Sequence, residues 1–128
     1  MKAISTKAAP AAVGPYSQGI EACGLVFISG QLPIDPVTST IPEGVAAQAE
    51  RAFANVIAIL EASGLNAGNV VKTTVFLADL NDFSVVNEVY AKIFSKPFPA
   101  RSCVQVAAIP KGALLEVEVV AQTAKLIG

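Results

Sequence analysis

The sequence predicts an α+β domain in which two helices pack on one face of a mixed sheet of about six strands. Two segments carry apolar residues at helical spacing, which indicates helices with one buried side each. The other apolar segments are short and bounded by glycine and proline, which is typical of strands. Because two helices cover only one face of such a sheet, the other face would remain apolar and open.

The first third of the chain is expected to form a loop and two strands. Residues 8–15 are rich in alanine and proline, which indicates an N-terminal loop that becomes ordered by packing against another segment. Residues 16–21 can form a strand. Residues 25–29 are mainly β-branched and aromatic, which indicates a strand buried on both faces. Gly30 and Pro33 would end or bend it.

Two helices follow, with a strand between them. The first spans residues 45–63, with Gln48, Arg51, Asn55 and Glu61 outside an apolar stripe of Ala49, Ala52, Phe53, Val56, Ile57 and Leu60. Residues 71–78 alternate as in a strand with one more polar face. The second helix is capped by Asn81 or Asp82, and its stripe comprises Phe83, Val86, Tyr90 and Ile93 or Phe94.

Two strands complete the domain. One runs from Pro99 to about Ala107 and is expected to be buried. After a turn at residues 109–112, the last strand covers residues 115–123. Strand side chains alternate between faces, so Glu116 and Glu118 should share one face of this last strand.

The composition points to one oligomeric domain. At 128 residues the chain suits a single core. Its charged fraction is 15%, against about 25% in average proteins, and its mean hydropathy is +0.58. No apolar run is long enough for a membrane span, so the surplus apolar surface is expected to lie between subunits, with the sheets inward and the helices outward. A dimer and a trimer both satisfy this argument.

Charge and cysteine content exclude several classes of protein. The formal net charge is −1 and the lysines are scattered, so no basic stripe is available for nucleic acid. The two cysteines lie far apart and suggest free thiols in a reducing compartment. The first 15 residues lack the apolar core of a secretory signal. The cytoplasm is the expected compartment, with an organelle left open.

Arg101 is the sharpest candidate for chemistry. It is one of two arginines, and the other, Arg51, falls on the expected polar side of the first helix. A guanidinium entering an apolar region requires a planar anionic partner. That partner is either Glu116 or Glu118, if the last two strands form a hairpin, or the carboxylate of a ligand. Spacing alone leaves the two alternatives equal.

Any catalysis must proceed without histidine, because the sequence contains none. Cys103 should share a face with Arg101, but a small packing role is preferred to that of a nucleophile, since no base is available to activate the thiol. Glu116 could hold a water as a general base or form half of an ion pair. Weaker candidates, which could line a pocket or simply pack, are Tyr16, Ser29 with Gly30, and Asn87.

Several motifs, taken in order, resemble the reactive intermediate deaminase A family, also called RidA or YjgF. The similarity covers nearly the whole chain, residues 1–128, and only the ordered set of motifs is specific. The motifs are Gly14-Pro15-Tyr16 with Gln18, Ser29-Gly30-Gln31 with Pro33, Lys72 to Phe76, Asp79 to Phe83, Asn87, Pro99 to Val104, Pro110-Lys111, and Glu116-Val117-Glu118.

The resemblance implies a chorismate mutase-like fold assembled as a homotrimer, with sites in clefts between subunits. It implies hydrolysis of the imines 2-iminobutanoate and 2-iminopropanoate to 2-oxo acids and ammonia, without a metal or organic cofactor. Arg101 would clamp the substrate carboxylate, Glu116 would activate water, and the Cys103 backbone would meet the imine. The other pocket residues implied are Tyr16, Ser29, Gly30 and Asn87.

Two other functions are alternatives. The first is an endoribonuclease or translation inhibitor, an activity ascribed to some members of the family, against which the acidic chain and the absence of histidine argue. The second is a trimer without catalysis that binds small carboxylates or acts like a chaperone. Turnover of an imino acid separates both from a deaminase.

Overall fold

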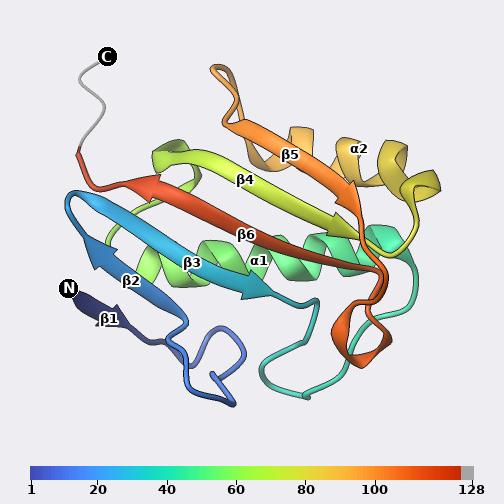
Figure 1. Ribbon diagram of the computed structural model, residues 1–128, viewed down its shortest axis with the longest axis horizontal. Helices are drawn as coiled ribbons and strands as arrows, with labels where there is room; N and C mark the ends of the chain where they lie inside the picture. Colours follow the sequence, from blue (N-terminus) through green and yellow to red (C-terminus); the bar gives the residue numbers. More distant parts are fainter. Residues whose placement is uncertain (125–128) are drawn as a thin grey trace.

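The structure, a computed structural model, describes residues 1–124 and arranges them as a six-stranded sheet covered on one side by two helices (Figure 1). The predicted mixed sheet with two helices on one face is confirmed, since β4 and β5 are parallel and the other neighbours antiparallel. The helices are α1 (Val45–Ala62) and α2 (Phe83–Ile93). The strands are β1 (Lys2–Ile4), β2 (Gly19–Ala22), β3 (Leu25–Gln31), β4 (Val70–Leu77), β5 (Ala100–Gln105) and β6 (Leu115–Gln122).

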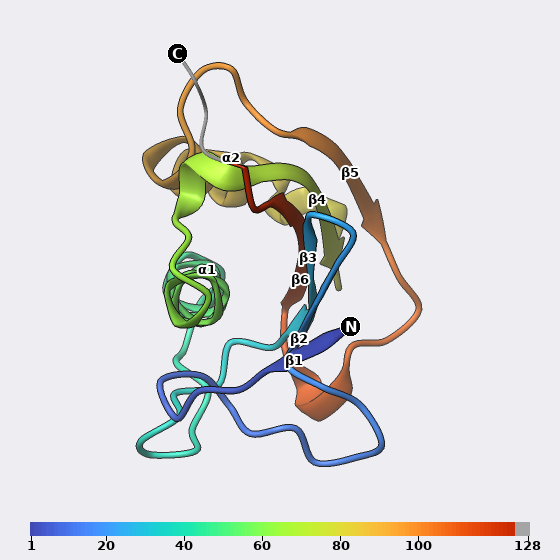
Figure 2. The ribbon, with the colours of Figure 1, turned by 90° about the vertical axis from the view of Figure 1, so that its left-hand side faces the viewer.

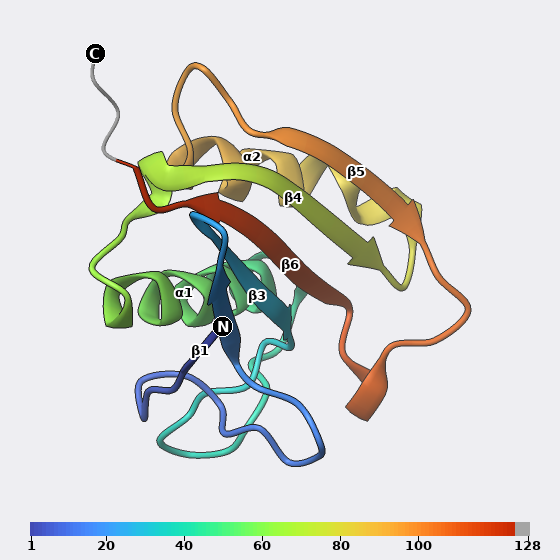
Figure 3. The ribbon, with the colours of Figure 1, turned by 60° about the vertical axis from the view of Figure 1, so that its left-hand side comes forward.

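The strands do not lie in the order in which they follow along the chain. Across the sheet they run β1-β2-β3-β6-β4-β5, so β4 separates β5 from β6 (Figure 3). The last two strands therefore do not form a hairpin, which was the condition for pairing Arg101 with Glu116 or Glu118. Instead, β4, α2 and β5 form a crossover unit of two parallel strands joined by a helix. β5 becomes an edge strand, and the loop after it carries the chain back to the middle of the sheet.

Helix α1 forms the centre of the core. Its buried stripe comprises Ala49, Ala52, Phe53, Val56, Ile59 and Leu60, with Ile59 in place of the expected Ile57. Gln48 and Asn55 are also buried, contrary to expectation, and their amides are satisfied by bonds to the backbone of neighbouring segments. Asn55 Nδ2 donates to the carbonyls of Leu32 and Ile34 at 3.0 and 2.9 Å. Arg51, expected on the solvated surface, is half-buried and donates to Asn55 Oδ1 at 2.9 Å.

Helix α2 buries a shorter stripe against α1 and the sheet. Its buried residues are Val86, Val89 and Tyr90, followed by Phe94 just after the helix. Phe83 does not belong to this stripe as expected: it is 38% exposed, and its ring lies against the edge strand β5. Among residues 1–124, no helix combines the length and apolar character needed to cross a bilayer.

The two faces of the sheet differ sharply in burial. Both helices lie on one side, and the other side is open (Figure 2). On the open face Phe27 in β3 is 46% exposed and Val104 in β5 is 44% exposed. The expectations that β3 is buried on both faces and that residues 99–107 form a buried strand are therefore wrong within one chain, because no second layer covers this face.

The N-terminal segment is ordered by one buried amide. Residues 8–15 form a loop, as expected, whereas β1 was not expected and the predicted strand at residues 16–21 is displaced to β2. Gln18 is 4% exposed, and its side chain bonds to the backbone of Thr6, Ala9 and Pro10. These bonds fix residues 6–10 against Gln18, which lies just before β2.

Candidate active site

Arg101 lies at the start of β5, on the sheet face that the helices cover. It pairs with Thr73 of β4, whose side chain is fully buried on that face. Its Nη1 donates to Asn87 Oδ1 at 2.6 Å. The carbon of its guanidinium is 4.8 Å from the ring centre of Tyr90 and 5.4 Å from that of Phe83. These residues, Arg101, Asn87, Phe83 and Tyr90, are called the arginine cluster below.

Glu116 lies on β6, on the open face of the sheet. It pairs with Phe76 of β4 and is half-buried. Burial raises the pKa of the Glu116 carboxyl, and the carboxylate of Glu118, two residues along the same face, raises it further. A carboxyl group with a raised pKa is suited to accept and return a proton nearer neutral pH.

A β-bulge places Gly30 directly over Glu116. The pairing of β3 with β6 shifts register between Ile28 and Gln31, so Ser29 and Gly30 form the bulge. A Cβ atom on Gly30 would lie 2.8 Å from Cδ of Glu116, so the carboxyl group occupies the space that a side chain would need. Gly30 is therefore required to leave this space free.

Ser29 connects the bulge to the loop that carries Tyr16. Its Oγ donates to the carbonyl of Ser17 at 2.6 Å, and its backbone N–H donates to the carbonyl of Gln18 at 2.9 Å. Tyr16 is 51% exposed and free to contact a ligand or another chain. Glu116, Gly30 and Ser29 are called the carboxylate cluster below.

The structure does not bring the two clusters together within one chain. Arg101 shares the face of Thr73, whereas Glu116 shares the face of Phe76, and neighbouring residues of one strand alternate. Arg101 and Glu116 therefore lie on opposite faces of the sheet with β4 between their strands. The same holds for Glu118, so neither internal carboxylate is the partner of Arg101.

Cys103 shares the helix-side face with Arg101, as the alternation predicts. It is half-buried and packs against the core. Burial raises the pKa of the Cys103 thiol, and the positive charge of Arg101 opposes this shift without cancelling it. The thiol is therefore a poor nucleophile near neutral pH.

Phe83 and Tyr90 contact Arg101, although their spacing predicts both for the apolar stripe of the second helix. The available signal was their spacing with Asn87, since residues three and four apart share one face of a helix. That face could be connected with Arg101 only once β5 was known to pack beside α2.

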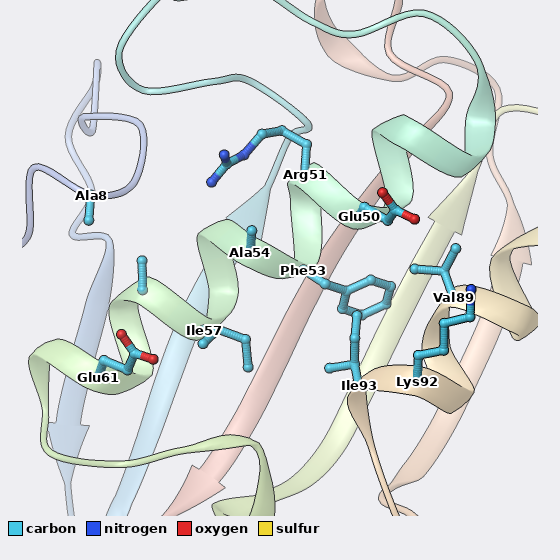
Figure 4. Close-up of a pocket in the computed structure, with 11 residues that line it drawn as sticks. Ala8, Glu50, Arg51, Phe53, Ala54, Ile57, Glu61, Val89, Lys92 and Ile93 are labelled. Carbon is cyan, nitrogen blue, oxygen red and sulfur yellow. The ribbon is translucent and has the colours of Figure 1, made fainter.

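A separate hollow of about 400 Å³ lies on the outer side of the two helices (Figure 4). Phe53, Ile57, Val89 and Ile93 form its apolar floor, and Glu50, Glu61 and Lys92 lie at its margin. None of the predicted site residues contributes to it. Among residues 1–124, no three His, Cys, Asp or Glu side chains are grouped so that they could hold a metal ion.

Comparison with known proteins defines the class of this chain. A family model described as Endoribonuclease L-PSP matches residues 6–123. The chain is 51% identical over 123 residues to the 2-iminobutanoate/2-iminopropanoate deaminase of Salmonella typhimurium, covering 94% of this chain and 96% of that protein. It is 52% identical over 121 residues to the protein of the same name from Bos taurus, covering 94% and 88%.

Solved structures agree with this class. RidA from Psychrobacter sp. superimposes with a TM-score of 0.92 at 50% identity, covering 95% of this chain and 99% of that one. E. coli TdcF with bound serine superimposes with a TM-score of 0.93 at 47% identity, covering 97% and 100%. The chain belongs to the RidA/YjgF family, whose family model carries the L-PSP name, and the resemblance inferred from the motifs is confirmed.

Proposed function

We propose that this protein is a 2-iminobutanoate/2-iminopropanoate deaminase, which hydrolyses these imines to 2-oxo acids and ammonia. The observation that carries the proposal is the pair of clusters: a guanidinium with no carboxylate partner among residues 1–124, and a half-buried carboxyl group with a raised pKa. Relatives with this deaminase name are about half identical over nearly the whole chain.

The active site forms between subunits of a homotrimer whose sheets face inward. Arg101 and Glu116 of one chain point to opposite faces of the sheet, so a single chain cannot offer both to one small substrate. In the trimer the arginine cluster of one subunit meets the carboxylate cluster of its neighbour. Phe27 and Val104, exposed on the open face of one chain, become buried in this assembly.

Arg101 binds the substrate carboxylate through two parallel N–H donors, and Asn87 keeps the guanidinium in place. The imine carbon is then held beside the Cys103 backbone, in a pocket that Tyr16, Ser29 and Gly30 also line. The protonated imine is already electrophilic, so positioning and a carboxylate-held water supply the acceleration.

Glu116 carries the proton transfers. It accepts a proton from the water while the water oxygen bonds to the imine carbon, giving a carbinolamine. It returns that proton to the nitrogen, and the C–N bond breaks as the hydroxyl proton passes back to Glu116 and the carbonyl forms. The products are a 2-oxo acid and ammonia, and release of the last proton restores the ionised Glu116.

The test measures loss of a 2-imino acid generated in situ by an amino acid oxidase or a threonine dehydratase. The wild-type protein should accelerate imine loss and the matching release of 2-oxo acid and ammonia. An unchanged rate would refute the proposal. RNA cleavage by the same preparation would instead favour the ribonuclease alternative, and binding of 2-oxobutanoate without turnover would favour the non-catalytic carboxylate-binding trimer.

Activity should depend on the charge state of Glu116, because only its ionised form accepts a proton from water. Its raised pKa means that activity falls, on acidification, at a pH above the ordinary glutamate value of about 4.3. In Glu118→Gln, burial still raises the pKa of Glu116 but the smaller effect of the Glu118 charge is absent, so the acid limb of the kcat profile should move to lower pH while the plateau is kept. An acid limb that stays in place in Glu118→Gln would contradict this assignment.

A further inference from the structure

One face of α2 forms a seat for the Arg101 guanidinium. Phe83, Asn87 and Tyr90 follow one another at spacings of four and three residues, which places their side chains on the same side of the helix. All three meet Arg101: Asn87 through a hydrogen bond of 2.6 Å, and the two rings at 4.8 and 5.4 Å from the guanidinium carbon. These distances are within the range of cation–π contacts.

The Tyr90 ring is held firmly by the core. Its side chain is 5% exposed, and its hydroxyl shares a hydrogen bond of 2.8 Å with Thr73 Oγ1, which is fully buried. The ring meets Phe53 edge to face at 5.7 Å and lies 4.6 Å from the ring of Phe94. Because the Tyr90 ring is rigid, its contact limits the orientations that the flexible Arg101 side chain can adopt.

The residues that contact the Arg101 guanidinium are uncharged, which leaves its positive charge available to a substrate. A guanidinium has five N–H donors, and among the described residues Asn87 accepts from one nitrogen, Nη1. A carboxylate partner would hold Arg101 equally well, but it would compete with the carboxylate of a substrate. Two neutral rings and one amide oxygen orient the cation without neutralising it.

We propose that Phe83 and Tyr90 are positioning residues, which hold the guanidinium of Arg101 in a fixed orientation with its remaining donors free for the substrate carboxylate. The inference rests on the proposed function only for its kinetic readout. Its structural readout concerns Arg101 itself and is independent of turnover.

The structural test uses the ¹H–¹⁵N NMR signals of the arginine Nε–H groups, of which the chain has only two. Arg51→Lys assigns the Arg101 signal by removing the other one. In the wild type, that signal should be shifted upfield by the ring currents and should exchange slowly with water. Tyr90→Phe keeps the ring and should keep the shift, whereas Tyr90→Leu and Phe83→Leu should move the signal toward that of a free arginine.

The kinetic test asks whether the rings act through substrate binding. In Tyr90→Leu the KM for the imino acid should rise about tenfold while kcat stays within about twofold of wild type, and Tyr90→Phe should restore the KM. Val86→Ala is the matched control, because it removes buried volume from the same helix without touching the guanidinium. It should leave both the Arg101 signal and the KM unchanged.

The outcomes separate the two proposals. If the wild type does not hydrolyse imino acids but the Arg101 signal responds as described, the proposed function is refuted, whereas the positioning role of Phe83 and Tyr90 is supported. If Tyr90→Leu leaves the Arg101 signal unmoved, or if Val86→Ala produces the same shift and the same KM, the seat is refuted even though the deaminase is active. A loss confined to kcat would also refute it.

Discussion

Arg101→Ala is expected to abolish measurable acceleration of 2-imino acid hydrolysis, a fall in kcat/KM of about 100-fold or more. The guanidinium is the cation of the arginine cluster, and Glu116 and Glu118 of the same chain, which lie on the other sheet face, cannot take the place of the substrate carboxylate. Its loss removes both the binding of the substrate carboxylate and the alignment of the imine with water. Initial rates with an imino acid generated in situ measure the effect.

Arg101→Lys and Arg51→Ala make this result specific. Lysine keeps the charge but not the planar pair of donors, and it cannot lie flat on Tyr90, so an intermediate rate is expected. Arg51→Ala removes the other arginine, whose described hydrogen bond is to Asn55, and it should lower stability rather than turnover. An Arg101→Ala variant that is folded and retains wild-type activity would show that Arg101 is not the carboxylate clamp.

Gly30→Ala is expected to reduce kcat about 100-fold with little change in stability. The added Cβ would lie 2.8 Å from Cδ of Glu116, so the carboxyl group must move. Because this group is the far end of a flexible side chain, the movement costs the fold little. For catalysis the displacement is serious, because a carboxylate about 1 Å out of place no longer aligns the water.

The double variant decides whether Gly30 acts through Glu116. Glu116→Gln and the combination of Glu116→Gln with Gly30→Ala should have equal activity, because the alanine has no ionised carboxylate left to displace. Gly68→Ala is the control, since its Cβ would come within 3.0 Å of Asn66 Oδ1, remote from both clusters. If the losses of Gly30→Ala and Glu116→Gln multiply, the two residues act independently and the interpretation fails.

Local periodicity explains which parts of the fold could be predicted. Helix α1 and strand β6 appear within a residue or two of their expected bounds, because their apolar positions repeat at the helical and strand periods. The position of β5 could not be predicted in this way. Its neighbour is β4, whose paired residues lie 28 positions earlier in the sequence, and only a crossover through α2 brings the two strands together.

The burial of individual side chains could not be predicted from the periodicity of apolar residues either. Asn55 looks like a surface residue by composition, yet it is completely buried because two carbonyls from the loop after β3 need donors there. Phe83 looks like a core residue, yet it is partly exposed against Arg101. In both cases the decisive partner comes from a segment distant in sequence.

The groups available for catalysis follow from the sequence alone: the chain has no histidine, and its motifs, which include Arg101 and Glu116, are those of the RidA/YjgF family. The sequence also predicted a sheet face that no helix covers, but that face is mixed rather than apolar, because Glu116 and Glu118 lie on it beside Phe27 and Val104. Arg101 and Glu116 lie on opposite faces of the sheet, with β4 between their strands, and this arrangement could be known only from the folded chain. The physical reason is that strand order and register depend on long-range pairing, and register decides the face on which every side chain lies.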